Sequence, residues 1–463
     1  EISAIPRGSG NEKAIGEYLL DFAAKLGLEA RMDDLYNVVI KKPASPGCEH
    51  LDPVILQGHT DMVCEKNKNV EHDFTKDGIK LVVDGDILRA DGTLGADNGQ
   101  AVACMMAFLA RKDMKHPPLE CVFTSQEEVG LIGAIGFDPY DLKGTRMINM
   151  DCGPEGVCVA GSAGGTTIDI YKTVKRVPFA GEAVSLKVRG LKGGHSGGDI
   201  DKERGNANKI AARVLYAIAK EMKVNLVSMD GGMMMNAIPR ECDAVAAVAD
   251  AAKAAEIAAE VEKKVKSELE FSDPGLTITL EPAAAPAEML CDEDSDAFLK
   301  MLYLMPAGLV AKSMALEGLT VASQNLAAVK TQEDGRLYIL YSLRSSVNSF
   351  LDDMGEKIDL LCHVFGAEAI FRPGFPTWEY TAKSELRDML AKAYKELTGK
   401  EMKVEATHGG LEGGAFLSKM PGLDIAAIGC DATGAHTPQE QLDLNSYKRM
   451  VDLVARVLEM MCE

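Results

Sequence analysis

The sequence predicts an α/β fold of two domains: a mixed-sheet domain that carries the candidate catalytic residues, and an α/β lid domain inserted into it. Three observations support this prediction. The chain has 463 residues, more than one ordinary domain contains. Short apolar runs alternate with runs of helical spacing from about residue 12 to residue 151. A segment near the C-terminus contains a histidine, His436, that is a candidate metal ligand, so the tail is expected to rejoin the first domain.

Composition excludes several classes of protein. Hydrophobic residues make up 46% and charged residues 26% of the chain, which is typical of globular proteins. A net charge of −20 argues against nucleic acid as a partner. No apolar run approaches the roughly 18 residues that a membrane span requires. The eleven cysteines include no C-x-x-C pair, which indicates reduced thiols and a cytoplasmic protein.

The first candidate site element follows the apolar run Val54–Leu56, which predicts a buried strand. This strand would deliver His59 to the carboxyl end of a sheet, where α/β folds bind ligands. Residues two apart in an extended segment project to the same side, so Asp61 is expected to accept the second ring N–H of His59 and fix the tautomer that a metal needs. Alone, such a pair is more typical of a surface loop, and only the rest of the chain favours a metal site.

The second element is Asp97, which stands just before a helix predicted from Gln100 to Arg111. One interpretation is a helix N-cap. The glycine-containing approach from Asp91 to Gly95 lets the backbone come close to a compact group, which a cap does not require. A carboxylate that bridges two cations explains both features.

The third element is a predicted strand from Cys121 that ends in Glu127 and Glu128. Two adjacent acids at the end of a buried strand are costly unless they are paired or bind metal. Neighbouring side chains diverge, so we expect different roles: Glu128 as a metal ligand and Glu127 as a general base toward water.

Two further elements complete the set. Asp151 ends a predicted strand that begins at Arg146, and His436 lies in the segment from Gly434 to Pro438. With a hydroxide ion, the carboxylates of Asp97, Glu128 and Asp151 would balance the charge of two divalent cations. The pattern therefore predicts a two-metal hydrolase.

The domain order follows from these positions. Residues 1-164 are expected to form the first part of the catalytic domain, residues 165-374 the lid, and residues 375-463 the second part. Small residues from 159 to 165 predict a hinge. In the lid, strands at 183–188 and 242–248 and helices at 206–222 and 251–269 favour an antiparallel sheet with helices.

These motifs, in this order, closely resemble those of the M20 metallopeptidase family over essentially the whole chain. The segments at 5–12 (IPRGSGNE), 58–63 (GHTDMV) and 408–414 (HGGLEGG) are similar to its aminoacyl-histidine dipeptidase (Xaa-His dipeptidase) branch. The resemblance implies one metal held by His59, Asp97 and Asp151 and another held by Asp97, Glu128 and His436. It also implies a cis peptide bond between Asp97 and Asn98. Zinc is the first expectation, because the ligands are imidazole and carboxylate, with manganese or cobalt as alternatives.

The same resemblance assigns substrate-binding residues in the lid. His195 would polarise the substrate carbonyl, delivered either within one chain or from the partner in a homodimer formed through the lid. Asn236 would help to hold the substrate. Arg344 would clamp the free carboxylate, since its planar guanidinium meets a carboxylate bidentately; a structural ion pair is the alternative. Outside the lid, His408 and Glu412 lie in a glycine-rich loop that we expect near the substrate amine; a glycine-rich turn with no contact to substrate is the alternative.

The predicted function is a cytoplasmic di-zinc dipeptidase that cleaves Xaa-His and other dipeptides, including β-alanyl-histidine. Whether histidine is required, and whether β-alanyl or α-aminoacyl substrates are preferred, stays open. An N-acyl amino acid deacylase would share the metal site, and a non-catalytic binding protein is disfavoured because no ligand or base has been lost.

Overall fold

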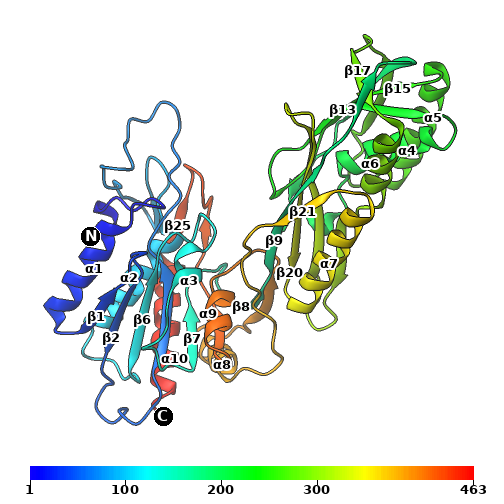
Figure 1. The fold of residues 1–463 in the computed structure, drawn as a ribbon. Helices are drawn as coiled ribbons and strands as arrows, with labels where there is room; N and C mark the ends of the chain where they lie inside the picture. Colours follow the sequence, from blue (N-terminus) through cyan, green and yellow to red (C-terminus); the bar gives the residue numbers. More distant parts are fainter. The chain divides into compact units, whose positions relative to one another are not determined.

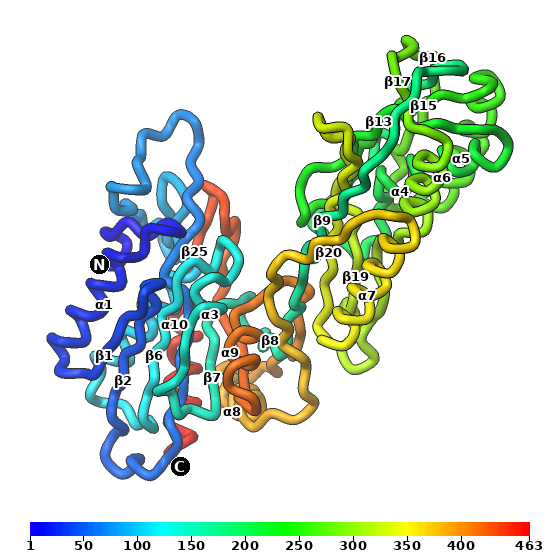
Figure 2. Tube along the Cα trace, in the orientation of Figure 1, coloured from blue at the N-terminus to red at the C-terminus, as the bar shows by residue number.

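The computed structural model describes residues 1–463, and the chain forms two compact units. Unit 1 comprises Glu1–Ser162 and Trp378–Glu463, and unit 2 comprises Ala163–Thr377. Both chain termini belong to unit 1 (Figure 2). Unit 1 contains a mixed sheet and unit 2 an antiparallel one, and each unit has its own hydrophobic core. The predicted α/β fold is confirmed.

Unit 1 is built on an eight-stranded mixed sheet (Figure 1). The strands β3, β6, β7 and β23 run parallel, whereas β1 and β2 are antiparallel to their neighbours. Because the carboxyl ends of β3, β6 and β7 meet at one edge, the residues that follow them converge there. In spatial order the strands are β1 (Glu29–Met32), β2 (Val38–Lys42), β6 (Leu119–Thr124), β3 (Val54–His59), β7 (Arg146–Asn149), β23 (Asp424–Ala427), β8 (Val157–Ser162) and β22 (Lys403–Thr407).

Helices cover both faces of this sheet. Val38 and Ile40 of β2 pack into one core cluster and Val39 into another, as the alternation of a pleated strand requires. The first cluster includes residues of α1 (Lys13–Leu26), α2 (Ala96–Ala110), α8 (Glu385–Thr398) and α10 (Leu444–Met460). The second includes residues of α3 (Ile132–Gly136) and α9 (Gly413–Lys419). A small sheet of β24 (Ala432–Thr433), β25 (Gln441–Asp443), β5 (Ile87–Arg89) and β4 (Val82–Asp84) and a short 3-10 helix at Ile2–Ala4 complete unit 1.

Unit 2 contains an antiparallel sheet, the arrangement expected for the lid, and this sheet has nine strands. Its main path is β16 (Thr277–Pro282), β11 (Glu182–Arg189), β15 (Cys242–Val248), β13 (Val224–Gly231), β19 (Thr320–Thr331), β20 (Leu337–Ser345), β9 (Gly164–Lys172) and β21 (Glu368–Phe371), with β18 (Gly308–Lys312) beside β19. One core cluster joins this sheet to α4 (Ala207–Ala219), α5 (Ala251–Glu268), α6 (Asp292–Leu304) and α7 (Asn348–Val364). Three smaller elements lie outside the nine-stranded sheet. They are the pair β10 (Arg176–Pro178) with β17 (Glu288–Leu290), the pair β12 (Gly194–His195) with β14 (Ala237–Ile238), and a 3-10 helix at Ile200–Lys202.

Local sequence signals set several helix ends. The side chains of Asn206, Asp250, Ser384 and Asp443 accept backbone N–H groups at the starts of α4, α5, α8 and α10. Such caps satisfy donors that the first helical turn leaves without a partner. Each of these helices consequently begins within one or two residues of a polar side chain that the sequence displays.

The small-residue segment predicted as a hinge is strand on both sides of Ala163. Ser162 forms a bridge with Trp378, and Gly165 forms one with Phe375. A Cβ atom on Gly164 would lie 2.6 Å from the backbone nitrogen of Thr377, so the outgoing and returning chains require small residues here. Each of these bridges therefore pairs the outgoing chain with the returning chain inside one unit.

No helix combines the length and the apolar character that crossing a membrane requires. All eleven cysteines are free thiols, and most of them are buried. The absence of disulfide bonds agrees with the expectation that the thiols are reduced.

Replacement of Phe298 by alanine should lower the free energy of unfolding by about 3–5 kcal/mol, because the ring is fully buried in the core of unit 2. Urea denaturation followed by circular dichroism measures the change. Phe271→Ala is the matched control, since this phenylalanine is 92% exposed, and it should change the same quantity by less than about 0.5 kcal/mol. Equal effects of the two substitutions would contradict the assigned core.

Candidate active site

His59 is the last residue of β3 and is almost completely buried. Its two ring nitrogens face different carboxylates. Nδ1 lies 3.3 Å from Oδ1 of Asp61, and Nε2 lies 3.1 Å from Oδ1 of Asp97 and 3.5 Å from Oδ1 of Asp151. The expected contact between His59 and Asp61 is therefore present, with Nε2 directed at the other acids.

Asp97 lies at an irregular helix start. Its ψ of 103° is not helical, and its peptide bond to Asn98 is cis, as the family resemblance implies. The N-cap of α2 is Gly95, and Asp97 lies within the irregular first turn, so the N-cap interpretation is wrong. The carboxylate of Asp97 instead contacts imidazole nitrogens on two sides.

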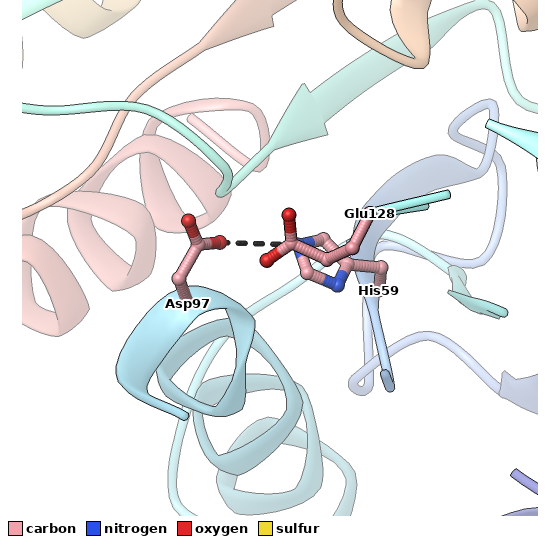
Figure 3. Close-up of side chains that lie close together, drawn as sticks. All are labelled: His59, Asp97 and Glu128. Atoms are coloured by element: carbon pink, nitrogen blue, oxygen red, sulfur yellow. Dashed lines mark hydrogen bonds and ion pairs between the residues drawn. The ribbon is translucent and has the colours of Figure 1, made fainter. Parts of the chain in front are cut away.

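Glu128 and His436 lie on the other side of Asp97. Nε2 of His436 is 2.9 Å from Oε2 of Glu128 and 3.4 Å from Oδ2 of Asp97. The second carboxylate oxygen of Glu128 is buried without a hydrogen-bond partner. Figure 3 shows the side chains of His59, Asp97 and Glu128 directed toward one another, with ligand atoms that lie within 4.8 Å of each other.

The two oxygens of Asp97 consequently serve two groups of residues. Oδ1 faces His59 and Oδ2 faces His436. Asp151 lies in the first group, and its Oδ1 also accepts a hydrogen bond of 2.7 Å from Nδ2 of Asn98. This donor set of imidazole nitrogens and carboxylate oxygens, with one buried oxygen left without a partner, fits divalent metal ions.

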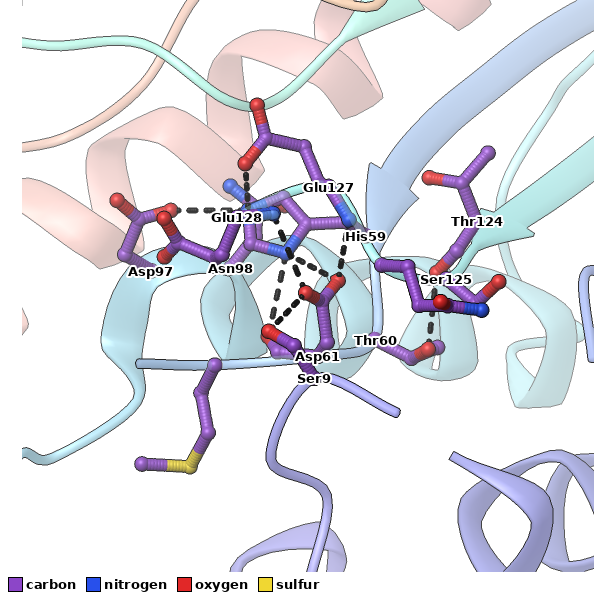
Figure 4. A network of polar contacts seen from close by, with 12 residues as sticks. Ser9, His59, Thr60, Asp61, Asp97, Asn98, Thr124, Ser125, Glu127 and Glu128 are labelled. Carbon is purple, nitrogen blue, oxygen red and sulfur yellow. Dashed lines mark hydrogen bonds and ion pairs between the residues drawn. The ribbon is translucent and has the colours of Figure 1, made fainter. Parts of the chain in front are cut away.

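Asp61 orients the two adjacent glutamates through their backbone (Figure 4). Its carboxylate accepts the N–H of Glu127 at 3.0 Å, the N–H of Glu128 at 3.2 Å and the hydroxyl of Ser9 at 2.7 Å. The carboxylate of Glu127 then lies 4.0 Å from Nε2 of His59. The two glutamates thus occupy different positions around His59, as their divergence along the chain predicts.

Burial, hydrogen bonds and neighbouring charges shift the pKa values of this cluster. Hydrogen bonds to Asp97 and Glu128 raise the pKa of His436 to about 10. Burial raises the pKa of Asp151 to about 7, with His59 opposing the shift and Asp97 adding to it. Burial likewise raises the pKa of Glu127, against the opposing effect of His59. Cations bound among these carboxylates would offset the cost of their burial.

Two supporting residues were not predicted. The carboxylate of Glu440 accepts the N–H of Gly95 at 2.8 Å and the N–H of Asp97 at 3.1 Å. The guanidinium of Arg7 is 4% exposed and donates to the carbonyls of Thr60 and Gly95 at 2.8 and 2.6 Å. In the sequence, Glu440 lies in a polar run that reads as surface, whereas Arg7 belongs to the 5–12 segment noted only for its family resemblance.

The loop predicted to approach the substrate amine lies in unit 1. Glu412 has no exposed surface, and its Oε2 accepts hydrogen bonds from Nε2 of Gln57 at 2.6 Å and Oγ1 of Thr124 at 2.8 Å. These contacts link α9 to β3 and β6. His408 is 8% exposed. A contact of either residue with the substrate stays a prediction.

His195 lies in unit 2, at the end of the short strand β12, and is exposed. Its Nδ1 accepts hydrogen bonds from the backbone N–H groups of Gly197 at 3.1 Å and Gly198 at 3.0 Å. Because Nδ1 is an acceptor, the ring proton resides on Nε2. Burial and the nearby guanidinium of Arg344 lower the pKa of His195, which favours this neutral form.

Arg344 lies on β20, partly exposed, with its guanidinium 5.7 Å from the ring of Phe375. Burial lowers its pKa, and no acidic neighbour raises it. Arg344 therefore has no acidic partner with which to form the alternative, a structural ion pair.

Asn236 is exposed, and its carbonyl accepts the N–H of Ser196 at 2.8 Å. Unit 2 thus brings His195, Arg344 and Asn236 together, and unit 1 brings together Asp61, Glu127 and the five predicted ligands.

Comparisons with known proteins identify relatives of this chain among peptidases. The model of peptidase family M20/M25/M40 matches residues 55–460. The cytosol non-specific dipeptidase of Escherichia coli (strain K12) is 35% identical over 466 aligned residues, which cover 99% of this chain and 96% of the relative.

Solved structures give the same result. The aminoacylhistidine dipeptidase of Vibrio alginolyticus superposes with a TM-score of 0.93 at 34% identity, over 99% of this chain and 94% of that chain. The aminopeptidase PepT of Bacillus cereus ATCC 10987 has a TM-score of 0.57 at 16% identity, over 100% of this chain and 96% of that chain, which shows a shared fold.

Glu440→Gln should weaken metal binding by about 10–100-fold, because the amide cannot accept both N–H groups that position Asp97. Competition with a chelating dye measures the affinity. Glu396→Gln, on the exposed face of α8, is the control and should bind metal as the unmodified protein does. An unchanged affinity of the Glu440 variant would show that these hydrogen bonds do not position Asp97.

Proposed function

The chain belongs to peptidase family M20/M25/M40, and we propose that it is a di-metal dipeptidase that cleaves Xaa-His and other dipeptides. The observation that carries this proposal is the position of Asp97, whose two oxygens face the two histidines. A single carboxylate in this position suits two cations that share a ligand. His59 and Asp151 would complete one ligand group, and Glu128 and His436 the other. Zinc is the proposed metal, with manganese or cobalt as alternatives.

Bound divalent ions would polarise the peptide carbonyl and lower the pKa of water. The side chains around them would supply the proton transfer. Glu127 lies beside His59, and Asp61 fixes the glutamate backbone by accepting its N–H. We assign Glu127 as the general base that takes a proton from water and returns it to the leaving amine.

The groups of unit 2 suit the substrate. The N–H of His195 at Nε2 is a donor for the carbonyl oxygen on which negative charge develops. The guanidinium of Arg344 has no acidic partner and is available to a terminal carboxylate. Asn236 lies on the turn beside Ser196 and would add a further hydrogen bond.

Two finer assignments concern the location of the protein and its oligomeric state. A cytoplasmic location is supported by the eleven free thiols and by the name of the Escherichia coli relative. A homodimer formed through unit 2 would deliver His195 in trans, and a monomer would deliver it in cis. Mass measurement in solution distinguishes these states.

Replacement of Glu127 by alanine should lower kcat by about 10²–10⁴-fold while the metal content stays unchanged, because Glu127 acts on the proton and is not a proposed ligand. Activity assays and elemental analysis of the same preparation test both parts. Glu17→Ala, on the exposed face of α1, is the control. Loss of metal together with activity would reassign Glu127 as a ligand.

Purified protein with added Zn²⁺ or Mn²⁺ should release amino acids from Ala-His, β-Ala-His and Gly-Gly, and not from N-acetyl-His. The reason is that a dipeptidase accepts a free amine, whereas a deacylase on the same metal site accepts the acylated compound. Product release measured by chromatography decides between them. Cleavage of N-acetyl-His alone would overturn the dipeptidase proposal.

A further inference from the structure

One face of the large sheet in unit 2 is free of helices where Arg344 lies, since the apolar cluster on that face (Ala327, Ala328, Leu340 and Tyr338) contains residues of strands alone. Along β20, Ile339, Tyr341 and Leu343 belong to the core cluster that includes α4, α5, α6 and α7. Alternation along the strand directs Ser342 and Arg344 to the opposite face. A substrate group bound by Arg344 therefore lies on this helix-free face.

The loop between β13 and β14 contains three adjacent methionines, here called the methionine segment (Met233–Met235). Their side chains are 74%, 57% and 45% exposed. A polar connection is the usual outcome for an exposed loop, so three exposed apolar side chains in succession require an explanation. None of the roles assigned above uses them.

Hydrogen bonds hold this segment beside the proposed substrate groups. The carbonyl of Met235 accepts the hydroxyl of Ser342 at 3.1 Å, two residues from Arg344 on the same face. It also accepts the hydroxyl of Ser196 at 3.4 Å, directly after His195. The hydroxyl of Thr167, which pairs with Ser342 across the sheet, donates to the sulfur of Met235 at 3.4 Å.

His195 and Arg344 lie near one another, because the residue after His195 and a residue two positions before Arg344 donate hydrogen bonds to the same carbonyl, that of Met235. In a dipeptide whose carbonyl oxygen meets His195 and whose carboxylate meets Arg344, the Cα atom of the C-terminal residue lies between the two. The methionine segment is joined to both groups through Ser196 and Ser342, so it lies beside the position of this Cα atom.

We propose that the methionine segment contacts the side chain of the substrate's C-terminal residue and determines which residues are accepted there. This inference rests on the proposed dipeptidase function. Thioether side chains are flexible and polarizable, and they make favourable contacts with aromatic rings. They carry no charge and no fixed shape, so the segment accepts aliphatic, aromatic and imidazole side chains. It is thus a source of broad preference at the C-terminal position, with histidine as one accepted residue.

The test replaces all three methionines by serine and compares two series of substrates. In Ala-Gly, Ala-Leu, Ala-Phe and Ala-His the C-terminal side chain varies, and in Leu-Gly and Phe-Gly only the N-terminal one does. The triple variant should lower kcat/KM about tenfold for Ala-Leu, Ala-Phe and Ala-His. Values for Ala-Gly, Leu-Gly and Phe-Gly should stay within about twofold, since glycine presents no side chain to the segment.

Two controls accompany the triple variant. Met235→Leu should keep the preference for apolar C-terminal residues, because it retains an apolar side chain of similar size. Met314→Ser removes a fully exposed methionine elsewhere in unit 2 and should change no substrate ratio. Circular dichroism and metal content confirm that each variant is folded.

Three results would overturn the inference alone. The first is an equal fall in kcat/KM for every substrate, including Ala-Gly, which would show a structural role for the loop. The second is a selective fall for Leu-Gly and Phe-Gly, which would place the contact at the N-terminal residue. The third is a change of sedimentation coefficient with unchanged substrate ratios, which would assign the segment to contact between copies of the chain. Absence of dipeptide cleavage by the metal-loaded, unmodified protein would instead overturn the proposed function, and this inference with it.

Discussion

The buried carboxylate of Asp61 joins three segments that are distant in the sequence. It faces the ring of His59, accepts the hydroxyl of Ser9, and accepts the N–H groups of Glu127 and Glu128. A fully buried carboxylate needs this number of partners, because each unsatisfied oxygen would cost free energy. The same hydrogen bonds fix the direction in which the two glutamates leave the end of β6. The relative positions of a proposed base and a proposed ligand thus depend on one side chain that touches neither substrate nor metal in the proposed scheme.

Arg7 is the cationic counterpart of this arrangement. It is the one buried arginine among Asp61, Asp97 and Glu440, and its guanidinium donates to backbone carbonyls around them. Burial lowers its pKa, while these carboxylates raise it. Because the acids outnumber the nearby cationic side chains, the protein alone does not neutralise the negative charge of the cluster. That imbalance is the physical reason why a donor set of this composition is suited to divalent ions.

Short apolar runs followed by acids allowed much of this site to be predicted. The strands that end near His59, Glu127 and Asp151 were recognisable because buried parallel strands are continuous runs of apolar residues. The role of Glu440 was not predictable, since its neighbours in the sequence are polar and its partners Gly95 and Asp97 lie more than 340 residues away. The environment of Glu412 was equally hidden, because its contacts depend on how α9 packs against two strands. Local patterns report which face of a strand is buried, and they do not report which distant backbone group a side chain meets.

The order of strands in unit 1 has a consequence for biosynthesis. β7 pairs with β3 on one side and with β23 on the other, and β23 is separated from β7 by the whole of unit 2. A ribosome therefore releases about 270 residues between these two neighbours, and for that interval β7 is an open edge of the nascent sheet. The inserted unit can complete its own antiparallel sheet first, since all of its strands lie within one continuous stretch of chain. Closure of the first sheet, together with arrival of His436, is then a late event that converts an aggregation-prone intermediate into the complete cluster of acids and imidazoles.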